Sequence, residues 1–295
     1  MSATTIQTPS GSTAPPPART KRRRWTYYIL PVFTITMIVY LASPIIVMFV
    51  FSFNVLQGQE RQVAKFTCCT LDWWQGLLDQ QPLNEALLMS VRVAIPAALI
   101  ATILGALIGL VLGRYRFHGR AVINFVIFLA IAIPEIVLGS ALLSMFVQVN
   151  EWTVSGFRFD LGYQTILISH IGFAVAFVAI TVRARVQGLD RSLENAAQDL
   201  YATPAVAFQR VTLPLILPGI VAGFLLAFVL SLDDFVITTF VNGDANTFPT
   251  WVYGTARRGI PPQVNVWGTV LFLAGVTTAG LNLVVAFRKR RRERT

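Results

Sequence analysis

Long apolar runs separated by short polar stretches dominate the chain. A run can cross a hydrocarbon core of about 30 Å as a helix if it holds roughly 20 residues. We expect such spans at residues 25–53, 93–113, 121–150, 161–182, 211–241 and 264–287. In the second, Gly105 and Gly109 have the small-xxx-small spacing that lets two helices approach closely. The pattern therefore predicts an all-α membrane protein with six transmembrane helices.

Composition supports this class, because 55% of the 295 residues are hydrophobic and only 13% are charged. The formal net charge of +10 is gathered at the ends of the apolar runs. Basic residues in this position face anionic lipid in cytoplasmic loops, so we expect membrane lipids as partners and no nucleic acid. Their distribution also places both termini and the loop 190–214 in the cytoplasm.

The chain divides into a disordered basic tail at residues 1–24, a membrane domain at 25–288 and a short basic tail at 289–295. The adjacent Cys68 and Cys69 indicate neither a disulfide framework nor a metal site. His118 and His170 lack zinc-ligand spacing, and we expect His170, inside an apolar run, to form a hydrogen bond to a neighbouring helix.

Three acidic residues lie inside expected spans, where an ionisable group is costly and usually faces a cavity or a partner. Asp234 shares one helical face with Ser231 and Thr238, whereas Asp233 points about 100° away. Glu135 follows Pro134 directly in another span. We interpret these residues as candidates for a substrate pathway that favours a cation. The alternative is that the acids form interhelical hydrogen bonds or pair with an arginine.

The cytoplasmic stretch 190–214 is polar and has helical periodicity. Leu193, Ala196, Ala197 and Leu200 share a small apolar face that needs a partner to bury it. Thr203 followed by Pro204 is a helix-start signal, so we expect two short helices that meet near residues 201–203.

This stretch, ENAAQDLYATPAVAFQRVTLP at 194–214, resembles the EAA loop of ABC-importer permeases. Asn195 stands in place of the family's glutamate, with Glu194 beside it, and Tyr201 stands in place of a glycine. Because tyrosine avoids positive φ, we expect other residues or an ordinary backbone conformation to make the turn. The resemblance implies an ATPase-docking loop made of Glu194, Asn195, Ala196, Ala197, Asp199, Leu200, Tyr201, Ala202 and Pro204.

The runs LSLDDFVITTFVNG at 230–243 and FVFSFN at 49–54 are similar to the C-type permease of spermidine/putrescine importers. This implies a type I ABC-importer permease fold and a place in the bacterial cytoplasmic (inner) membrane. It also implies a second permease, two ATP-binding subunits and an extracytoplasmic substrate-binding protein. No phosphate-binding Gly-x-x-x-x-Gly-Lys loop occurs in the chain, so we expect no cofactor here, and ATP with Mg in the separate ATPase.

The solute remains open within this class. A small organic cation other than a polyamine, iron(III) or an organophosphonate are alternatives. From other classes, a membrane-embedded enzyme would require a catalytic motif such as His-Glu-x-x-His or Gly-x-Ser-x-Gly, and neither occurs. An ion channel would leave the cytoplasmic loop unexplained.

Overall fold

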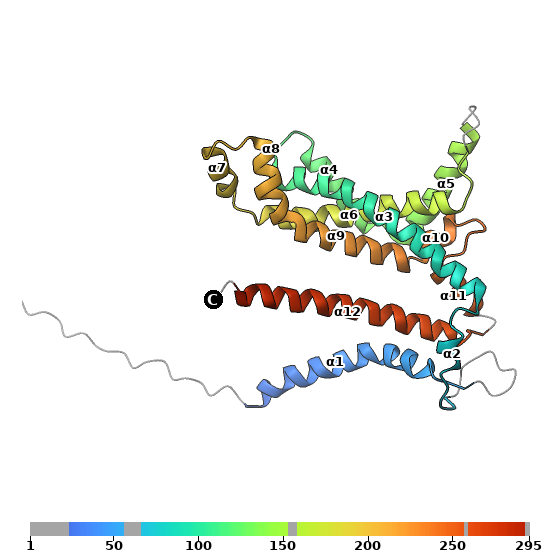
Figure 1. Ribbon diagram of the computed structural model, residues 1–295. Coiled ribbons are helices and arrows are strands. Elements are labelled where there is room, and N and C mark those ends of the chain that lie inside the picture. Colours follow the sequence, from blue (N-terminus) through green and yellow to red (C-terminus); the bar gives the residue numbers. More distant parts are fainter. Residues whose placement is uncertain (1–23, 56–65, 153–157, 257–258, 293–295) are drawn as a thin grey trace, which may run out of the picture.

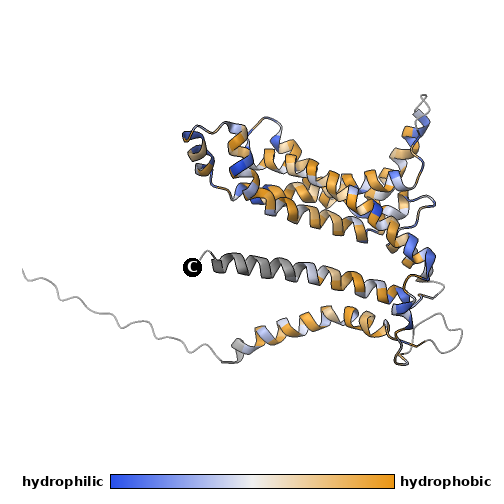
Figure 2. Cartoon of the chain, viewed as in Figure 1, coloured by the Kyte–Doolittle hydropathy of each residue, from blue (hydrophilic) through white to orange (hydrophobic). Residues whose placement is uncertain are grey.

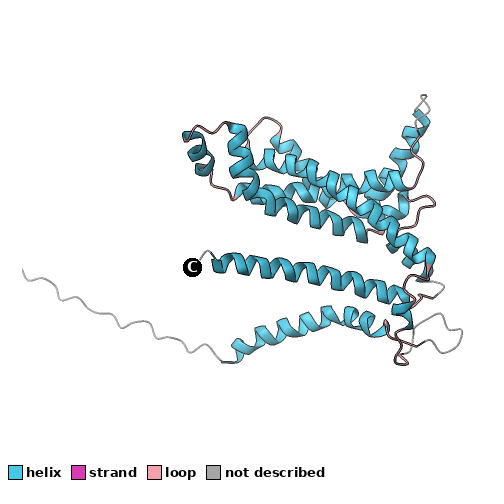
Figure 3. Cartoon of the chain, in the orientation of Figure 1, coloured by secondary structure: helices cyan, strands magenta, loops and turns pink. Residues whose placement is uncertain are grey.

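The computed structural model describes residues 24–55, 66–152, 158–256 and 259–292. Within these ranges all regular structure is helical (Figure 3). The elements in chain order are α1 Arg24–Phe51, α2 Asp72–Gln75, α3 Gln81–Arg114, α4 Arg120–Ala132, α5 Glu135–Trp152, α6 Tyr163–Gln187, α7 Ser192–Asp199, α8 Pro204–Ala207, the π-helix η1 Phe208–Thr212, α9 Leu213–Asp233, α10 Val236–Val241, α11 Phe248–Ala256 and α12 Gln263–Arg292. The expected disordered tail lies almost entirely outside the described residues.

The helices α3, α6 and α9 form the centre of the molecule and pack on one another (Figure 1). Their contact faces consist of small and β-branched side chains, among them Ala98 and Ala101 of α3, Val178 and Val182 of α6, and Ala227 of α9. Each of these five side chains is completely buried. Helices that present such small faces approach closely and gain dispersion contacts along their length.

The closest approach is at the two glycines of the small-xxx-small motif, as predicted. A Cβ at Gly105 would lie 2.6 Å from the Cβ of Val178, and a Cβ at Gly109 would lie 2.6 Å from the backbone oxygen of Ala179. Real Cβ atoms do not come this close, so α3 and α6 reach their separation only because both positions lack a side chain.

The expected spans match the structure in part. Four described helices are long and apolar enough to cross a membrane: 28–51 in α1, α3, α6 and the continuous stretch 204–233. Two expectations of an unbroken span are wrong. The span 121–150 divides at Ile133 and Pro134 into α4 and α5, which meet at 106° and count as a fifth span only if taken together. The span 211–241 is interrupted at Asp234, which lies between α9 and α10.

Other boundaries also differ from the expectations. Helix α3 begins at Gln81, twelve residues before the expected start, because the preceding stretch continues the helix despite its charged residues. Cys68 and Cys69 are joined in a disulfide, which we did not expect. The sixth expected span coincides with α12, although among the described residues α12 does not pass the length and hydropathy test.

Helices α1 and α12 lie beside each other and apart from the central helices (Figure 1). Most apolar side chains of α1 are exposed, whereas Ala42, Ile45, Met48 and Phe51 are half-buried. Figure 2 shows this helix as largely hydrophobic. The free ends of α1 and α12 lie at the same end of the molecule as α7 and α8, and α2 and α11 lie at the other end (Figure 1). That the end with α7 and α8 faces the cytoplasm remains a prediction, made from the distribution of basic residues.

The glycine contact gives a testable prediction for stability. Gly109→Ala places a Cβ against the α6 backbone, which cannot move aside cheaply, and should destabilise the folded chain by about 1–3 kcal/mol. The matched control is Gly172→Ala, because nothing lies within 4 Å of a Cβ at that position. Thermal unfolding of the purified chain in detergent measures both. Equal melting temperatures for the two variants would contradict the close α3–α6 contact.

Candidate functional site

Asp234 interrupts the helical path between α9 and α10 and caps the second helix. Its backbone is extended, with φ −62° and ψ 122°. Its carboxylate accepts hydrogen bonds from the backbone N–H of Thr238 at 2.8 Å, from the Thr238 hydroxyl at 2.7 Å and from the Ile237 N–H at 3.4 Å. The two N–H groups are among those that a new helix leaves without a backbone partner, so the Asp234 side chain makes the break possible in an apolar setting.

His170 of α6 holds the two sides of the break together. Its Nδ1 lies 2.7 Å from Ser231 Oγ, and its Nε2 lies 3.0 Å from Thr238 Oγ1 and 3.3 Å from Asp234 Oδ2. All four residues are buried. Ser231, Asp234 and Thr238 therefore do not share one continuous helix as predicted, but they meet around His170. The expected hydrogen bonding of His170 to a neighbouring helix is confirmed.

Asp233 has a different environment from Asp234. It is exposed in this chain and lines a cavity of about 610 Å³. The other lining residues come from α1, α3, α9, α11 and α12 and from Phe235 between α9 and α10, and most are apolar: Met48, Leu87, Leu232, Phe235, Phe248, Pro249, Val252, Tyr253, Ala256, Val264, Asn265, Gly268 and Leu271. The rings of Phe235 and Tyr253 have centroids 4.5 Å apart. The Asp233 carboxylate thus opens onto an aromatic and aliphatic surface.

Glu135 is exposed and is the first residue of α5, directly after the bend at Pro134. Helix α5 packs on α10, where a Cβ at Gly139 would lie 2.6 Å from the ring of Phe240. Glu135 therefore belongs to a helix that touches the Asp234-capped segment. Its role in a pathway, like those of Asp233, Asp234, Ser231 and Thr238, stays a prediction.

The predicted pair of short helices in the loop 190–214 is confirmed as α7 and α8. Thr203 caps α8, since its Oγ1 accepts from the Val206 N–H at 3.4 Å, and Pro204 is the first helical residue. At the other end, the Asp190 carboxylate accepts from the Ser192 N–H at 2.9 Å. This hydrogen bond, with that from the Ser192 hydroxyl, holds the pKa of Asp190 below its usual value.

The turn between these helices corrects one expectation. Tyr201 itself adopts the left-handed conformation, with φ 63°. The Tyr201 N–H donates to the Gln198 oxygen at 2.9 Å, and the Ala202 N–H donates to the Ala197 oxygen at 3.1 Å, as in a Schellman helix end. These two hydrogen bonds require positive φ at residue 201, so the tyrosine bears the strain that a glycine would avoid.

The residues of the predicted docking loop do not share one environment. Tyr201 and Leu200 are the most exposed, at 98% and 81%. Exposed with them are Asn195, Ala196, Asp199 and Pro204, and Ala197 and Ala202 are half-buried. The small apolar face of α7 therefore lacks a cover within the described chain. Glu194 alone among the predicted loop residues is buried.

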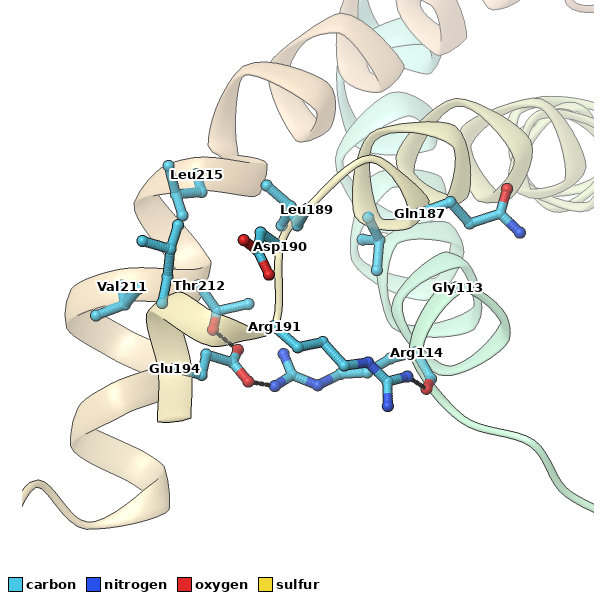
Figure 4. Close-up of a pocket in the computed structure, with 12 residues that line it drawn as sticks. Gly113, Arg114, Gln187, Leu189, Asp190, Arg191, Glu194, Val211, Thr212 and Leu215 are labelled. Atoms are coloured by element: carbon cyan, nitrogen blue, oxygen red, sulfur yellow. Dashed lines mark hydrogen bonds and ion pairs between the residues drawn. The ribbon is translucent and has the colours of Figure 1, made fainter. Parts of the chain in front are cut away.

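The Glu194 carboxylate contacts two other elements (Figure 4). One oxygen accepts a hydrogen bond from the Thr212 hydroxyl of η1, and the other pairs with the Arg114 guanidinium at the end of α3. The Arg191 guanidinium donates to the Arg114 backbone oxygen. These residues line a pocket of about 200 Å³.

Sequence reasoning missed several of these residues. The aromatic residues of the cavity come from segments far apart in the chain, and only Phe235, two positions after Asp233, was a local signal. Arg114 is one of the basic residues at the end of an apolar run and Thr212 lies within the loop motif, but neither position indicates a contact with Glu194. Partners from distant segments leave no spacing pattern from which they can be recognised.

Comparison with known proteins gives a family match over most of the chain. Residues 105–293 match the family described as binding-protein-dependent transport system inner membrane component. The putrescine transport system permease protein PotI of Escherichia coli (strain K12) is 37% identical over 234 residues, which cover 79% of this chain and 81% of that protein. The spermidine/putrescine transport system permease protein PotC of Haemophilus influenzae is 30% identical over 260 residues, with 88% and 96% covered.

Solved structures share the fold at lower identity. A chain of a bacterial ABC transporter involved in the import of the acidic polysaccharide alginate superposes with a TM-score of 0.65 at 18% identity, and 92% of this chain and 96% of that chain are covered. A chain of an amino acid ABC transporter gives 0.54 at 16% identity, with 72% and 97% covered. The architecture is therefore that of type I ABC-importer permeases.

The hydrogen bonds of Asp234 predict a structural cost for its removal. Asp234→Ala leaves the buried backbone N–H and hydroxyl of Thr238 without their acceptor and should destabilise the fold by about 1–3 kcal/mol. Asp233→Ala is the matched control, because the exposed Asp233 carboxylate caps no helix in this way. The melting temperature of the purified variants in detergent measures the difference, and an Asp234→Ala variant as stable as Asp233→Ala would refute it.

The strained tyrosine predicts a stabilising substitution. Tyr201→Gly removes the penalty of the left-handed conformation, which exceeds the extra chain entropy of glycine, and should strengthen the end of α7 by about 1 kcal/mol. Hydrogen exchange of the backbone amides at positions 201 and 202 should slow about fivefold in this variant. The control Leu200→Gly should make exchange of the same amides faster, because residue 200 has an ordinary φ of −89°. Faster exchange in Tyr201→Gly would contradict the strain.

Proposed function

This chain belongs to the family of binding-protein-dependent transport system inner membrane components, and we propose that the solute it carries is a polyamine. As a permease subunit of an ABC importer, the chain contributes helices to a pathway and performs no covalent chemistry itself. The relatives PotI and PotC are named for putrescine and for spermidine/putrescine transport. Their similarity over most of the chain favours the same solute class here.

The observation that carries this proposal is the Asp233 carboxylate at an otherwise aromatic and aliphatic cavity. A polyamine has ammonium groups joined by methylene segments. A carboxylate attracts an ammonium group, and aromatic faces such as those of Phe235 and Tyr253 add cation–π attraction. The aliphatic lining residues suit the methylene segments. An anionic organophosphonate would meet the Asp233 carboxylate unfavourably.

Asp233 and Asp234 then have separate tasks. Asp234 and its partners His170, Ser231 and Thr238 hold the helix break that positions Asp233 at the cavity. Asp233 is exposed and has no such set of partners among the described residues, so it is able to exchange water for a cation. Glu135, exposed on the adjoining α5, supplies a further negative charge for a cation that continues along the pathway.

The cytoplasmic partner in this proposal is a pair of ATP-binding subunits that dock on α7 and α8 and hold ATP and Mg. The uncovered face of α7, with Ala196, Leu200 and Tyr201 at the exposed tip, offers them an apolar surface. Exposed apolar side chains at a loop end are typical of a protein interface. Binding of ATP would favour one of two permease states, which gives alternating access.

The complete importer in this proposal also contains a second permease and an extracytoplasmic substrate-binding protein, and it resides in the bacterial inner membrane. The second permease would cover apolar surface that this chain leaves exposed, such as α1. The substrate-binding protein would deliver the solute at the end of the molecule where α2 and α11 lie (Figure 1).

The proposal predicts the outcome of an uptake assay. Cells that lack this chain should lose uptake of radiolabelled spermidine or putrescine, and the intact chain should restore it. Asp233→Asn should restore uptake about tenfold less well, because it keeps the shape of the side chain but loses the charge, whereas the amount of protein in the membrane should not change.

The matched control for this assay is Asp244→Asn, which removes another exposed carboxylate outside the cavity. Its uptake should equal that of the intact chain. Polyamine uptake that persists without the chain, in cells with no second importer, would refute the proposal that the solute is a polyamine. Full activity of Asp233→Asn would refute the site but leave the solute class intact.

A further inference from the structure

Glu194 is the point at which three elements meet at the α7 end of the molecule. The residue belongs to α7, and its carboxylate reaches Thr212 in η1 and Arg114 at the end of α3 (Figure 4). Helix η1 continues without a gap into α9. One side chain therefore connects α7 to two of the three central helices.

The orientation of Glu194 is unusual for a charged residue on such a short helix. Its neighbours Asn195 and Asp199 are exposed, whereas Glu194 is only 9% exposed. A carboxylate removed from water is costly unless its oxygens have partners. Here both oxygens have one, so the ion pair and the hydrogen bond together hold α7 in a defined position.

The rest of the loop contributes few other links to α3. Helix α7 packs mainly on η1 and α8, which precede α9. Toward α3, Arg191, the residue before α7, donates to the backbone oxygen of Arg114. Arg114 is therefore contacted twice, at its backbone by Arg191 and at its guanidinium by Glu194. The polar cluster therefore fastens α7 to α3 where apolar packing does not.

The backbone on the α9 side contains the π-helical turn η1. Thr212 is the last residue of a π-helical turn, and such turns are often found at functional sites within α-helices. A displacement of α7 would move the Glu194 carboxylate, and this would act on the turn through Thr212 and on the end of α3 through Arg114. The two helices pack along each other, so their relative position would respond.

We propose that Glu194 is the positioning residue that transmits the displacement of α7 to α3 and α9. The inference rests on the proposed function, because it takes the ATP-binding subunits to dock on α7. Glu194 does not contact those subunits itself. It converts movement of the docked helix into movement of the membrane helices, and the exposed residues of α7 provide only the docking surface.

The test uses the complete importer in lipid vesicles, with its ATP-binding subunits and binding protein. Glu194→Gln keeps the size of the side chain but loses the charge that pairs with Arg114. We expect solute transported per ATP hydrolysed to fall at least about tenfold, although the ATP-binding subunits stay bound and hydrolyse ATP. Asp244→Asn, which removes an exposed carboxylate outside the docking loop and the cavity, is the matched control and should behave as the unmodified complex.

A second variant tests the ion pair itself. Arg114→Gln should lower coupling as Glu194→Gln does, and the double variant should lose no more than either single variant, because both remove the same contact. Losses that multiply in the double variant would show that the two residues act separately, and this would overturn the proposed link.

Hydrogen exchange provides a readout that does not depend on the solute. On addition of ATP, the unmodified complex should change its exchange both in α7 and at residues 208–216, whereas Glu194→Gln should change it in α7 alone. The proposal fails if Glu194→Gln retains normal coupling or the response at 208–216, or if the ATP-binding subunits dissociate from it. Failure of the polyamine proposal would instead appear in the unmodified complex as absent polyamine transport.

Discussion

A helix that breaks within an apolar environment must find partners for the backbone groups that it frees. In this chain the side chain of Asp234 supplies them for α10, and His170 ties Asp234 and Thr238 to Ser231 at the end of α9. Asp233 reaches the cavity because the chain turns at this point. The candidate pathway carboxylate is therefore held in place by a neighbouring buried polar network.

Helix α3 connects the regions that matter for function. With 34 residues it is about 50 Å long. Toward its beginning, Ser90 Oγ accepts from the Phe248 N–H at 2.8 Å and Asn84 Oδ1 accepts from the Trp267 indole at 3.0 Å, and at its end Arg114 pairs with Glu194. One stiff element thus contacts α11 and α12 beside the cavity and α7 at the far end. Its close packing at Gly105 and Gly109 holds it against α6.

The carboxylates of the protein differ in how far their positions are determined. Those of Asp234 and Glu194 are buried and have partners on both oxygens, so their positions are fixed by these contacts. The carboxylates of Asp233 and Glu135 are exposed in this chain. A buried charge cannot release its partners without a large desolvation cost, whereas an exposed one exchanges its partners readily. This difference separates structural acids from candidate binding acids more clearly than their positions in the sequence do.

The sequence by itself determined the class of the protein, the positions of most membrane helices, the close contact at Gly105 and Gly109 and the two-helix loop with its Thr203 cap. These features depend on hydropathy, residue size and local capping, all of which act within one segment. Only the tertiary structure decided that α9 breaks at Asp234, that Tyr201 takes the left-handed turn, that Glu194 turns inward and that Asp233 shares a cavity with Phe235 and Tyr253. Periodicity tells which face of a helix a residue occupies, but the side chains that meet this face come from segments far away in the chain.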